Sequence, residues 1–230
     1  IRCAAIHAPN GRRLTIEGDA GAGYVINKEL FLQNLAEKAA EAGAEINMNQ
    51  RVVDLEHEEA GVKVKTGVRE WQTSLVLGAD GFSSTVSHRL GFEEKGTREL
   101  IPCIQYLMAN CNLEDPQSTE FYLGRSVAPL GYAWIFPKGG KRANVGVGVR
   151  GTPAKPYLDK LIREHPEVFA NARVIEVEAA PVTISGLLEK IADDNVMLVG
   201  EAAGQVIPLT GGGIHSSIVG GKLAGETAVK

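Results

Sequence analysis

The chain has 230 residues, of which 44% are hydrophobic, and a formal net charge of −4 at pH 7. These values are typical of a globular protein with one large or two small domains and a substantial core. The charge is slight and Lys and Arg do not cluster, which excludes an electrostatic footprint for nucleic acid, so nucleic acid is not expected as a partner.

The first elements predicted along the chain are a β-hairpin and a helix. Residues 1–16 alternate weakly around Pro9-Asn10-Gly11, and Asn-Gly is a typical hairpin turn. Residues 19–23, Asp-Ala-Gly-Ala-Gly, break that pattern. Residues 28–42 carry apolar side chains at helical spacing before a stop at Gly43, so we expect a helix there.

A series of short strands is predicted next. Residues 44–57 predict a strand that leads to a turn, and residues 62–66 and 70–74 predict a short meander. Residues 75–77 form a continuous apolar run before a glycine-containing loop. Such a run is typical of a strand that is buried on both faces of a parallel sheet.

The second half of the chain predicts an antiparallel sheet and a return to α/β structure. Between residues 98 and 150, three apolar runs with aromatic residues alternate with polar turns. Residues 157–164 predict a helix that His165-Pro166 ends, because the residue before a proline is pushed out of helical geometry. Residues 195–199 predict a second buried strand, followed by a glycine-rich loop and a helix from about Ile214. The expected fold class is therefore mixed α/β, with two domains whose segments alternate along the chain.

Cysteine usage and hydropathy indicate the compartment. Cys3, Cys103 and Cys111 form no CxxC pair and leave an odd count, which argues against a disulfide framework and for a reducing compartment. No apolar run reaches the ~18 to 20 residues of a membrane span, and no signal-peptide pattern begins the sequence. We expect a cytoplasmic protein, with peripheral contact to a membrane surface left open.

Two strand-to-helix junctions carry candidate cofactor chemistry. Open α/β sheets bind ligands beyond the carboxyl ends of their strands, where helix N-termini offer N–H groups to phosphates. In the first junction, Gly81 permits close backbone approach and Asp80 can accept hydrogen bonds from a ligand. A capped turn, in which Asp80 satisfies local backbone groups, is an equally good interpretation of this segment alone.

The second junction begins at Gly200. Glu201 stands at the strand end, where a carboxylate can bind a sugar or ribityl hydroxyl. Further candidates precede or open the next helix, where backbone amides can reach a phosphate or a ring carbonyl: Pro208, Gly211, Gly212, Gly213 and Ile214. A flexible loop is the alternative interpretation.

Together the two junctions resemble the paired loops of FAD proteins of the hydroxybenzoate-hydroxylase class. The resemblance implies that Asp80 and Gly81 lie near the pyrophosphate and that Glu201, where the class usually has aspartate, meets the ribityl chain. It also implies that Lys28, in place of the usual arginine, reaches the pyrophosphate and that the backbone of Val52 contacts the adenine. An exposed lysine and a core valine are equally good interpretations of these two positions.

The N-terminal dinucleotide fingerprint of that class is absent. Residues 146–151 satisfy G-x-G-x-x-G, but no helix follows them, so we reject them as a dinucleotide loop. We therefore expect the chain to be the middle of a longer protein. Residues 24–95 and 193–230 would form an incomplete FAD-binding domain, and residues 1–23 and 96–192 a substrate-binding domain.

One stretch narrows the function further. It holds three aromatic rings and a proline, followed by two glycines: Tyr132, Trp134, Phe136, Pro137, Gly146 and Gly148. Alternation along a strand places the three rings on one face, and the glycines leave room on the next strand. Such a wall suits a long hydrocarbon, although aromatic residues on one strand face more often belong to a core.

The spacing of these six residues resembles a motif of the geranylgeranyl reductases, and the similarity covers nearly the whole chain, including Gly23-Tyr24-Val25 and Phe121-Tyr122-Leu123-Gly124. The resemblance implies an FAD enzyme that reduces isoprenoid double bonds, in digeranylgeranylglycerophospholipids or in the geranylgeranyl chain of chlorophyll-type molecules. The six residues would then bind the isoprenoid substrate. NADPH or another, undetermined donor would reduce the flavin.

The implied reaction leaves its catalytic residue unidentified. An isolated alkene is not polarised, so it needs a hydride equivalent from reduced flavin and a proton on the other carbon. His215 lies near the glycine loop, but a histidine at a helix start is more often structural. No metal is predicted. An FAD-dependent aromatic hydroxylase of the same class and a non-catalytic lipid-binding module remain as alternatives.

Overall fold

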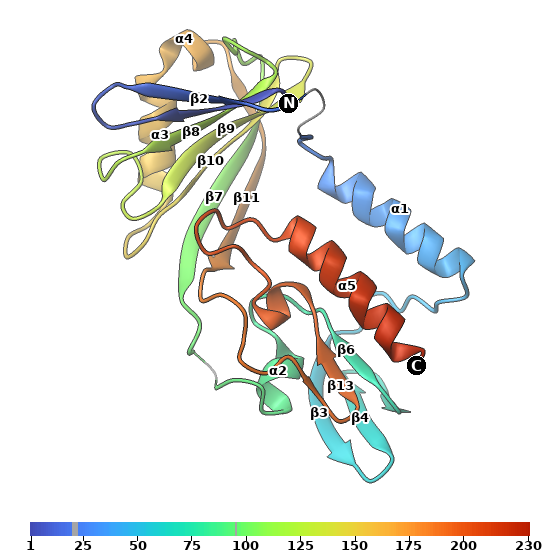
Figure 1. The fold of residues 1–230 in the computed structure, drawn as a ribbon. Coiled ribbons are helices and arrows are strands. Elements are labelled where there is room, and N and C mark those ends of the chain that lie inside the picture. Colours follow the sequence, from blue (N-terminus) through green and yellow to red (C-terminus); the bar gives the residue numbers. More distant parts are fainter. Residues whose placement is uncertain (20–22, 95) are drawn as a thin grey trace. The chain divides into compact units, whose positions relative to one another are not determined.

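The computed structural model describes residues 1–19, 23–94 and 96–230, and these form two compact units (Figure 1). Unit 1 comprises Ile1–Glu45 and Ile101–Pro181, and unit 2 comprises Ile46–Leu100 and Val182–Lys230. The chain thus passes twice through each unit. The predicted break over residues 19–23 lies mostly outside the described residues. The assignment of residues 24–95 and 193–230 to an FAD-binding domain and of residues 1–23 and 96–192 to a substrate-binding domain stays a prediction.

Unit 1 is built on a seven-stranded sheet with the strand order β11-β7-β10-β9-β8-β1-β2. Its strands are β1 Cys3–His7, β2 Arg13–Glu17, β7 Leu100–Ala109, β8 Ser118–Leu123, β9 Tyr132–Gly139, β10 Arg142–Gly148 and β11 Arg173–Thr183. Strands β1 and β2 form the predicted hairpin, and β7, β10, β9 and β8 pair antiparallel as predicted. Strand β1 also pairs parallel with β8, and no local sequence pattern predicts this pairing.

Helices α3 (Lys155–Glu164) and α4 (Pro166–Phe169) lie over one face of this sheet (Figure 1). Alternate strand residues such as Ile135 and Val145 point to this face and pack with Leu158 and Leu161 of α3. We call it the core face. The hydroxyl of Tyr106 on β7 donates to Asp159 Oδ1 of α3 at 3.2 Å, which ties the helix to the sheet.

Helix α1 (Lys28–Glu41) confirms the predicted helix between Lys28 and Gly43. Asn27 caps it by accepting from the backbone N–H of Leu30 at 3.1 Å, as expected of an N-cap asparagine. No residue of α1 is buried. Unit 1 is therefore held together by its sheet rather than by this helix.

Unit 2 contains two three-stranded sheets, β12-β13-β6 and β3-β4-β5. Its elements are β3 Val52–Glu58, β4 Gly61–Thr66, β5 Glu70–Thr73, β6 Val76–Gly78, α2 Thr85–Arg89, β12 Ala192–Asp193, β13 Val196–Leu198, a 3₁₀ turn Gly200–Ala203 and α5 Ile214–Ala228. Strands β6 and β13 pair parallel, and β3, β4 and β5 form an antiparallel meander. A small core joins Leu55, Val62, Val86, Val196 and Leu198. The expected mixed α/β fold class is confirmed.

Two local predictions in unit 2 were wrong in part. Residues 75–77 were expected to be buried on both faces, but Leu77 is 42% exposed, because β6 lies at the edge of its sheet among the described strands. The strand predicted over residues 44–57 begins only at Val52, because Asn49 adopts a left-handed φ of 57° in the preceding turn.

Candidate functional site

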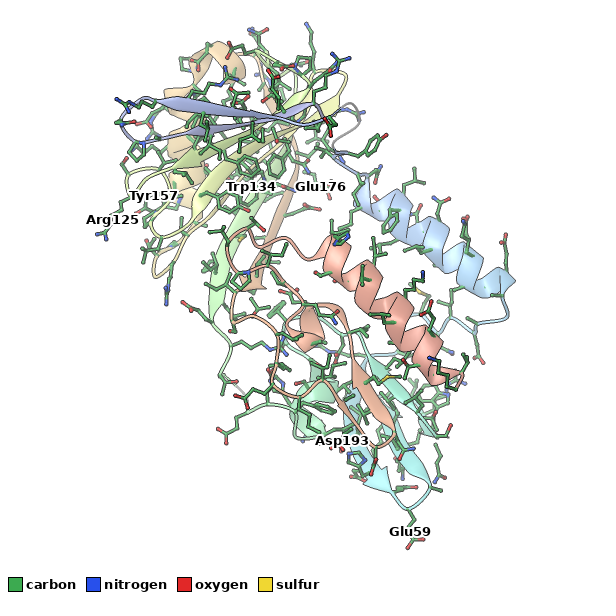
Figure 2. All side chains as sticks on the ribbon, in the orientation of Figure 1. Glu59, Arg125, Trp134, Tyr157, Glu176 and Asp193 are labelled. Atoms are coloured by element: carbon green, nitrogen blue, oxygen red, sulfur yellow. The ribbon has the colours of Figure 1, made fainter. Side chains whose placement is uncertain are left out.

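The strand face opposite the core face carries a cluster of four aromatic rings. Tyr132, Trp134 and Phe136 alternate along β9, as predicted, and Phe121 of β8 pairs directly with Trp134. Ring centroids lie 5.7 Å apart for Tyr132 and Trp134, 6.1 Å for Trp134 and Phe136, and 5.3 Å for Phe121 and Phe136. We call this the aromatic face; Figure 2 labels Trp134 among its side chains.

The rings are half-buried, whereas their sequence neighbours Ala133 and Ile135 are at most 2% exposed. None of the four rings belongs to the buried core of unit 1. Contacts in the range of 5 to 6 Å between centroids are favourable for aromatic pairs, so the cluster is ordered without being covered completely. This arrangement agrees better with an apolar wall than with a sealed core.

The two predicted glycines lie beside the rings. A Cβ at position 146 would stand 2.3 Å from Cζ2 of Trp134 and 2.5 Å from Cε2; the indole therefore lies against the backbone of β10, as only glycine permits. A Cβ at position 148 would stand 3.0 Å from Sγ of Cys103 and 4.0 Å from Cζ3 of Trp134. Both glycines allow the aromatic face to stay close to its strands.

Two further residues follow the rings along β9. Pro137, predicted to join the rings, is buried on the core side of the strand with Ala133 and Ile135, so its substrate contact remains a prediction that this placement does not favour. At the other end of the alternation, Nζ of Lys138 donates to the backbone carbonyl of Ile26 at 2.6 Å. The segment before α1 is thereby tied to β9.

Burial raises the pKa of the Tyr132 phenol above its ordinary value, with the neighbouring Cys103 as a second cause. A phenol is neutral in the physiological range at its ordinary pKa of about 10, and burial only strengthens that preference. The ring therefore presents an uncharged surface, which suits contact with a hydrocarbon.

In unit 2, Asp80 acts as a local capping group. Its Oδ2 accepts from the backbone N–H groups of Thr85 at 2.6 Å and Val86 at 3.2 Å, and its Oδ1 accepts from the Ser84 hydroxyl at 2.5 Å. Ser84 in turn caps α2 by accepting from Ser87 N–H at 2.9 Å. These contacts favour the capped-turn interpretation of Asp80, and its contact with a ligand, like that of Gly81, stays a prediction.

The second junction is held by a buried ion pair. Arg98 and Glu93 have side chains only 6% and 5% exposed, and Arg98 Nε lies 2.7 Å from Glu93 Oε1. The same guanidinium donates to the backbone carbonyls of Glu201 and Ala202, the latter at 2.6 Å. A buried charge that is paired and fully hydrogen-bonded can hold a backbone turn in place, so Arg98 shapes the loop that carries Glu201.

Only one of the two carboxylate oxygens of Glu201 accepts a hydrogen bond from the described residues. Its Oε1 accepts from the backbone N–H of Thr183 at 3.0 Å, while its Oε2 has no hydrogen-bond partner among the described residues. Gly204 closes the turn at a left-handed φ of 72°, where a Cβ would stand 2.0 Å from the carbonyl oxygen of Gly186. One carboxylate oxygen thus remains without a hydrogen bond to the described residues, and its contact with a ribityl hydroxyl stays a prediction.

The start of α5 offers backbone donors. Gly213 is its N-cap and provides no side-chain cap, and within the described part of the chain we find no acceptor for the amides of residues 214–216. Helix α5 is 15 residues long, and free amides at the N-terminus of such a helix favour the binding of a phosphate or a carbonyl oxygen. Of the predicted residues, Ile214 belongs to this set, whereas the amide of Gly211 donates to the carbonyl of Ile207 at 2.8 Å and that of Gly212 to Thr210 Oγ1 at 3.2 Å. The contacts of Gly211 to Ile214 with a flavin stay predictions. Pro208 lies nearby on an exposed loop, 3.8 Å from where a Cβ of Gly186 would stand.

Three other predicted positions lie where the structure shows no special environment. Lys28 is an exposed residue of the first turn of α1, and Val52 is partly buried against the core of unit 2. His215 is exposed near the start of α5. Their roles toward FAD or as a proton donor stay predictions. Within the described ranges, no group of three or more His, Cys, Asp or Glu side chains is placed to hold a metal ion.

Sequence reasoning missed Phe121 as a member of the ring cluster, and it missed Arg98 and Gln105 altogether. The alternation in β8 could have suggested Phe121. Arg98 contacts a carbonyl 103 positions away and Gln105 contacts Trp134 across 29 positions, and no local pattern reports such pairs.

Comparisons with known proteins identify the family that this chain matches. Residues 99–182 match the model of the geranylgeranyl reductase catalytic domain. The chain is 37% identical to digeranylgeranylglycerophospholipid reductase 1 of Methanosphaera stadtmanae over 99% of its length and 58% of the relative. It is 38% identical to digeranylgeranylglycerophospholipid reductase 2 of Methanothermobacter thermautotrophicus over 100% of its length and 61% of the relative. The chain therefore spans about three fifths of the curated relatives it matches.

Solved structures share the fold. A geranylgeranyl bacteriochlorophyll reductase-like protein from Thermoplasma acidophilum superposes with a TM-score of 0.89 at 32% identity, over 98% of this chain and 60% of that chain. A flavin-dependent brominase superposes with a TM-score of 0.74 at 18% identity, over 98% of this chain and 62% of that chain. No described helix combines the length and hydrophobicity needed to cross a bilayer.

Proposed function

The chain belongs to the geranylgeranyl reductase family, and from that premise we propose that it reduces the geranylgeranyl double bonds of membrane-lipid precursors with FAD as its cofactor. The observation that carries the proposal is the aromatic face, where Tyr132, Trp134, Phe136 and Phe121 stay half-buried and so keep part of each ring accessible. Flat rings offer large apolar contact area at a low cost in side-chain entropy. An isoprenoid chain, which has few polar groups, is the ligand that such a wall suits.

The residues of unit 2 support FAD as the cofactor. The amides at the start of α5 fit a phosphate or the flavin carbonyl, and Oε2 of Glu201 fits a ribityl hydroxyl. Bound and reduced, FAD supplies the hydride equivalent that an unpolarised alkene needs. Because both oxygens of Asp80 are engaged within the turn before α2, we propose that Asp80 shapes the first loop rather than contacting the cofactor through its side chain.

The substrate class follows from the named relatives, which are digeranylgeranylglycerophospholipid reductases. We propose a geranylgeranyl chain on a glycerophospholipid precursor, NADPH or another reductant as the electron donor, and peripheral contact with the membrane in which that lipid resides. The rings hold the chain by apolar contact, and exclusion of water around it protects the reduced cofactor from side reactions.

The test uses the intact, FAD-loaded protein under anaerobic conditions. Reduced flavin should be reoxidised when a geranylgeranyl glycerophospholipid is added, with formation of a saturated product. We expect Trp134→Ala to lower kcat/KM for the lipid by at least about tenfold, equivalent to about 1.4 kcal/mol of binding, while the visible absorption of bound flavin is unchanged.

The matched control is Trp71→Ala, because Trp71 belongs to unit 2 and packs against the Arg69 guanidinium, 4.4 Å from its ring centroid. This variant should retain turnover. Flavin reoxidation that requires O₂ and an aromatic substrate would instead identify a hydroxylase. A preparation that binds lipid but no flavin would identify a lipid-binding module.

A further inference from the structure

One row of four residues runs straight across the aromatic face. Trp134 of β9 pairs with Gly146 of β10, and Gly146 pairs with Gln105 of β7. The indole crosses over Gly146, and its Nε1 donates to Gln105 Oε1 at 2.9 Å. Gln105 Nε2 then donates to Glu178 Oε2 of β11 at 2.7 Å. The row therefore joins four neighbouring strands through two hydrogen bonds.

The chemistry of the three side chains gives this row one direction. An indole N–H can only donate and an ionised carboxylate can only accept. Gln105 must therefore turn its carbonyl to Trp134 and its amide nitrogen to Glu178. Because the negative carboxylate polarises the amide, the two hydrogen bonds reinforce each other. A flipped Gln105 would lose both of them.

Glycine at position 146 is what allows the row to form. Any Cβ there would stand 2.3 Å from the indole and 2.9 Å from the carbonyl oxygen of Ile104. The sheet therefore leaves room for the ring, but sterics alone do not select one of the rotations open to it. The selection comes from the hydrogen bond at the far edge of the indole, which pins the ring over β10.

We propose that Gln105 and Glu178 are positioning residues that hold the Trp134 indole flat across Gly146 and thereby set the surface on which the isoprenoid chain lies. The inference rests on the proposed function and deepens it, because it assigns the shape of the apolar wall to a polar pair behind the Trp134 ring. Neither residue is part of the aromatic motif found in the sequence.

The orientation of the ring is measured first, without lipid, in the intact protein labelled with ¹⁵N in its indoles. The signal of Trp134 is the one missing in Trp134→Phe. Gln105→Leu should move the indole proton signal upfield and accelerate its exchange with solvent at least about tenfold, as for the loss of a hydrogen bond worth about 1.4 kcal/mol. Glu178→Gln should keep slow exchange, because the new amide oxygen still accepts from Gln105. Gln117→Leu, at an exposed turn of unit 1, is the matched control and should change nothing.

Turnover of the geranylgeranyl lipid is measured second. Gln105→Leu and Trp134→Phe should each raise KM by about tenfold with little change in kcat, as for the loss of uniform binding. The double variant should match either single variant, because both remove the same contact.

Additive effects, or an indole signal that Gln105→Leu leaves unchanged, would overturn the positioning role. If the unaltered protein fails to reduce the lipid, the proposed function fails, while the exchange rates still decide whether Gln105 holds the ring.

Discussion

The two faces of the seven-stranded sheet in unit 1 are made by the same strands but covered differently. On the core face, Ile135 and Val145 are at most 2% exposed and pack beneath α3. On the aromatic face, Trp134 and Phe121 remain half-buried and are not members of the core cluster of unit 1. Because successive strand residues point to opposite faces, β9 serves stability with one set of side chains and ligand contact with the other. Adjacent substitutions should therefore have separable effects.

The largest expected effect is a difference in stability cost between a substitution on the core face and one on the aromatic face. Ile135→Ala removes a buried side chain and should lower the free energy of unfolding by about 3 to 4 kcal/mol, within the range for such cavities. Trp134→Ala, one residue earlier, should cost only about 1 to 2 kcal/mol because part of the ring is hydrated already. Urea denaturation of the intact FAD-loaded protein measures both. Equal costs for the two variants would mean that the rings belong to a core.

A smaller effect tests the fit of the indole. Gly146→Ala places a methyl group 2.3 Å from Cζ2 of Trp134 and should cost about 1 to 3 kcal/mol through overpacking, with displacement of the ring. Fluorescence of Trp134 and the KM for the lipid should change together. Gly67→Ala is the control, because no atom lies within 4 Å of a Cβ at that position. A neutral Gly146→Ala would show that the indole does not lie on β10.

The smallest effect concerns a tyrosine on the core side. Burial, assisted by the Glu120 carboxylate, raises the pKa of Tyr122 to about 12, whereas an unfolded tyrosine titrates near about 10. The folded state then keeps its proton where the unfolded state has lost it. This contribution is fully present below pH ~10 and is lost as the pH rises toward 12.

The shift corresponds to about 2.7 kcal/mol at most, and we expect about 1 kcal/mol because the ring is only half-buried. Tyr122→Phe should therefore flatten the fall in stability between pH ~10 and 12. Tyr24→Phe, whose ring is 85% exposed, should not. A wild-type profile that is unchanged by Tyr122→Phe would contradict the assigned burial.

Local patterns predicted much of the fold. The hairpin over β1 and β2, the helix α1, the meander of β3 to β5 and the antiparallel sheet each follow from alternation, helical spacing or turn residues, which act over a few positions. The exposure of Leu77 was mispredicted because burial depends on where a strand lies in its sheet, and the sequence does not report that. The long strand β11 was not predicted, since both of its faces are largely exposed and it lacks a binary pattern.

The candidate site divides in the same way. The motif from Tyr132 to Gly148 can be recognised because its rings and glycines recur at fixed spacing along two adjacent strands. The engagement of Asp80 in a cap, the clamp of Arg98 on the backbone of Glu201 and the bond from Trp134 to Gln105 could not be recognised in this way. Each depends on which atoms of a side chain are already hydrogen-bonded within the fold, and that depends on distance and direction rather than on residue type.

The sequence by itself determined the family, the mixed α/β class, most of the elements and the alternation that puts three rings of β9 on one face, because these follow from residue identity and short-range spacing. Only the tertiary structure decided that the core closes on the opposite face, that Phe121 completes the ring cluster, and that Gln105 and Glu178 orient the indole. These features require strands far apart in the chain to pair in one register, and register is fixed by packing of the whole sheet.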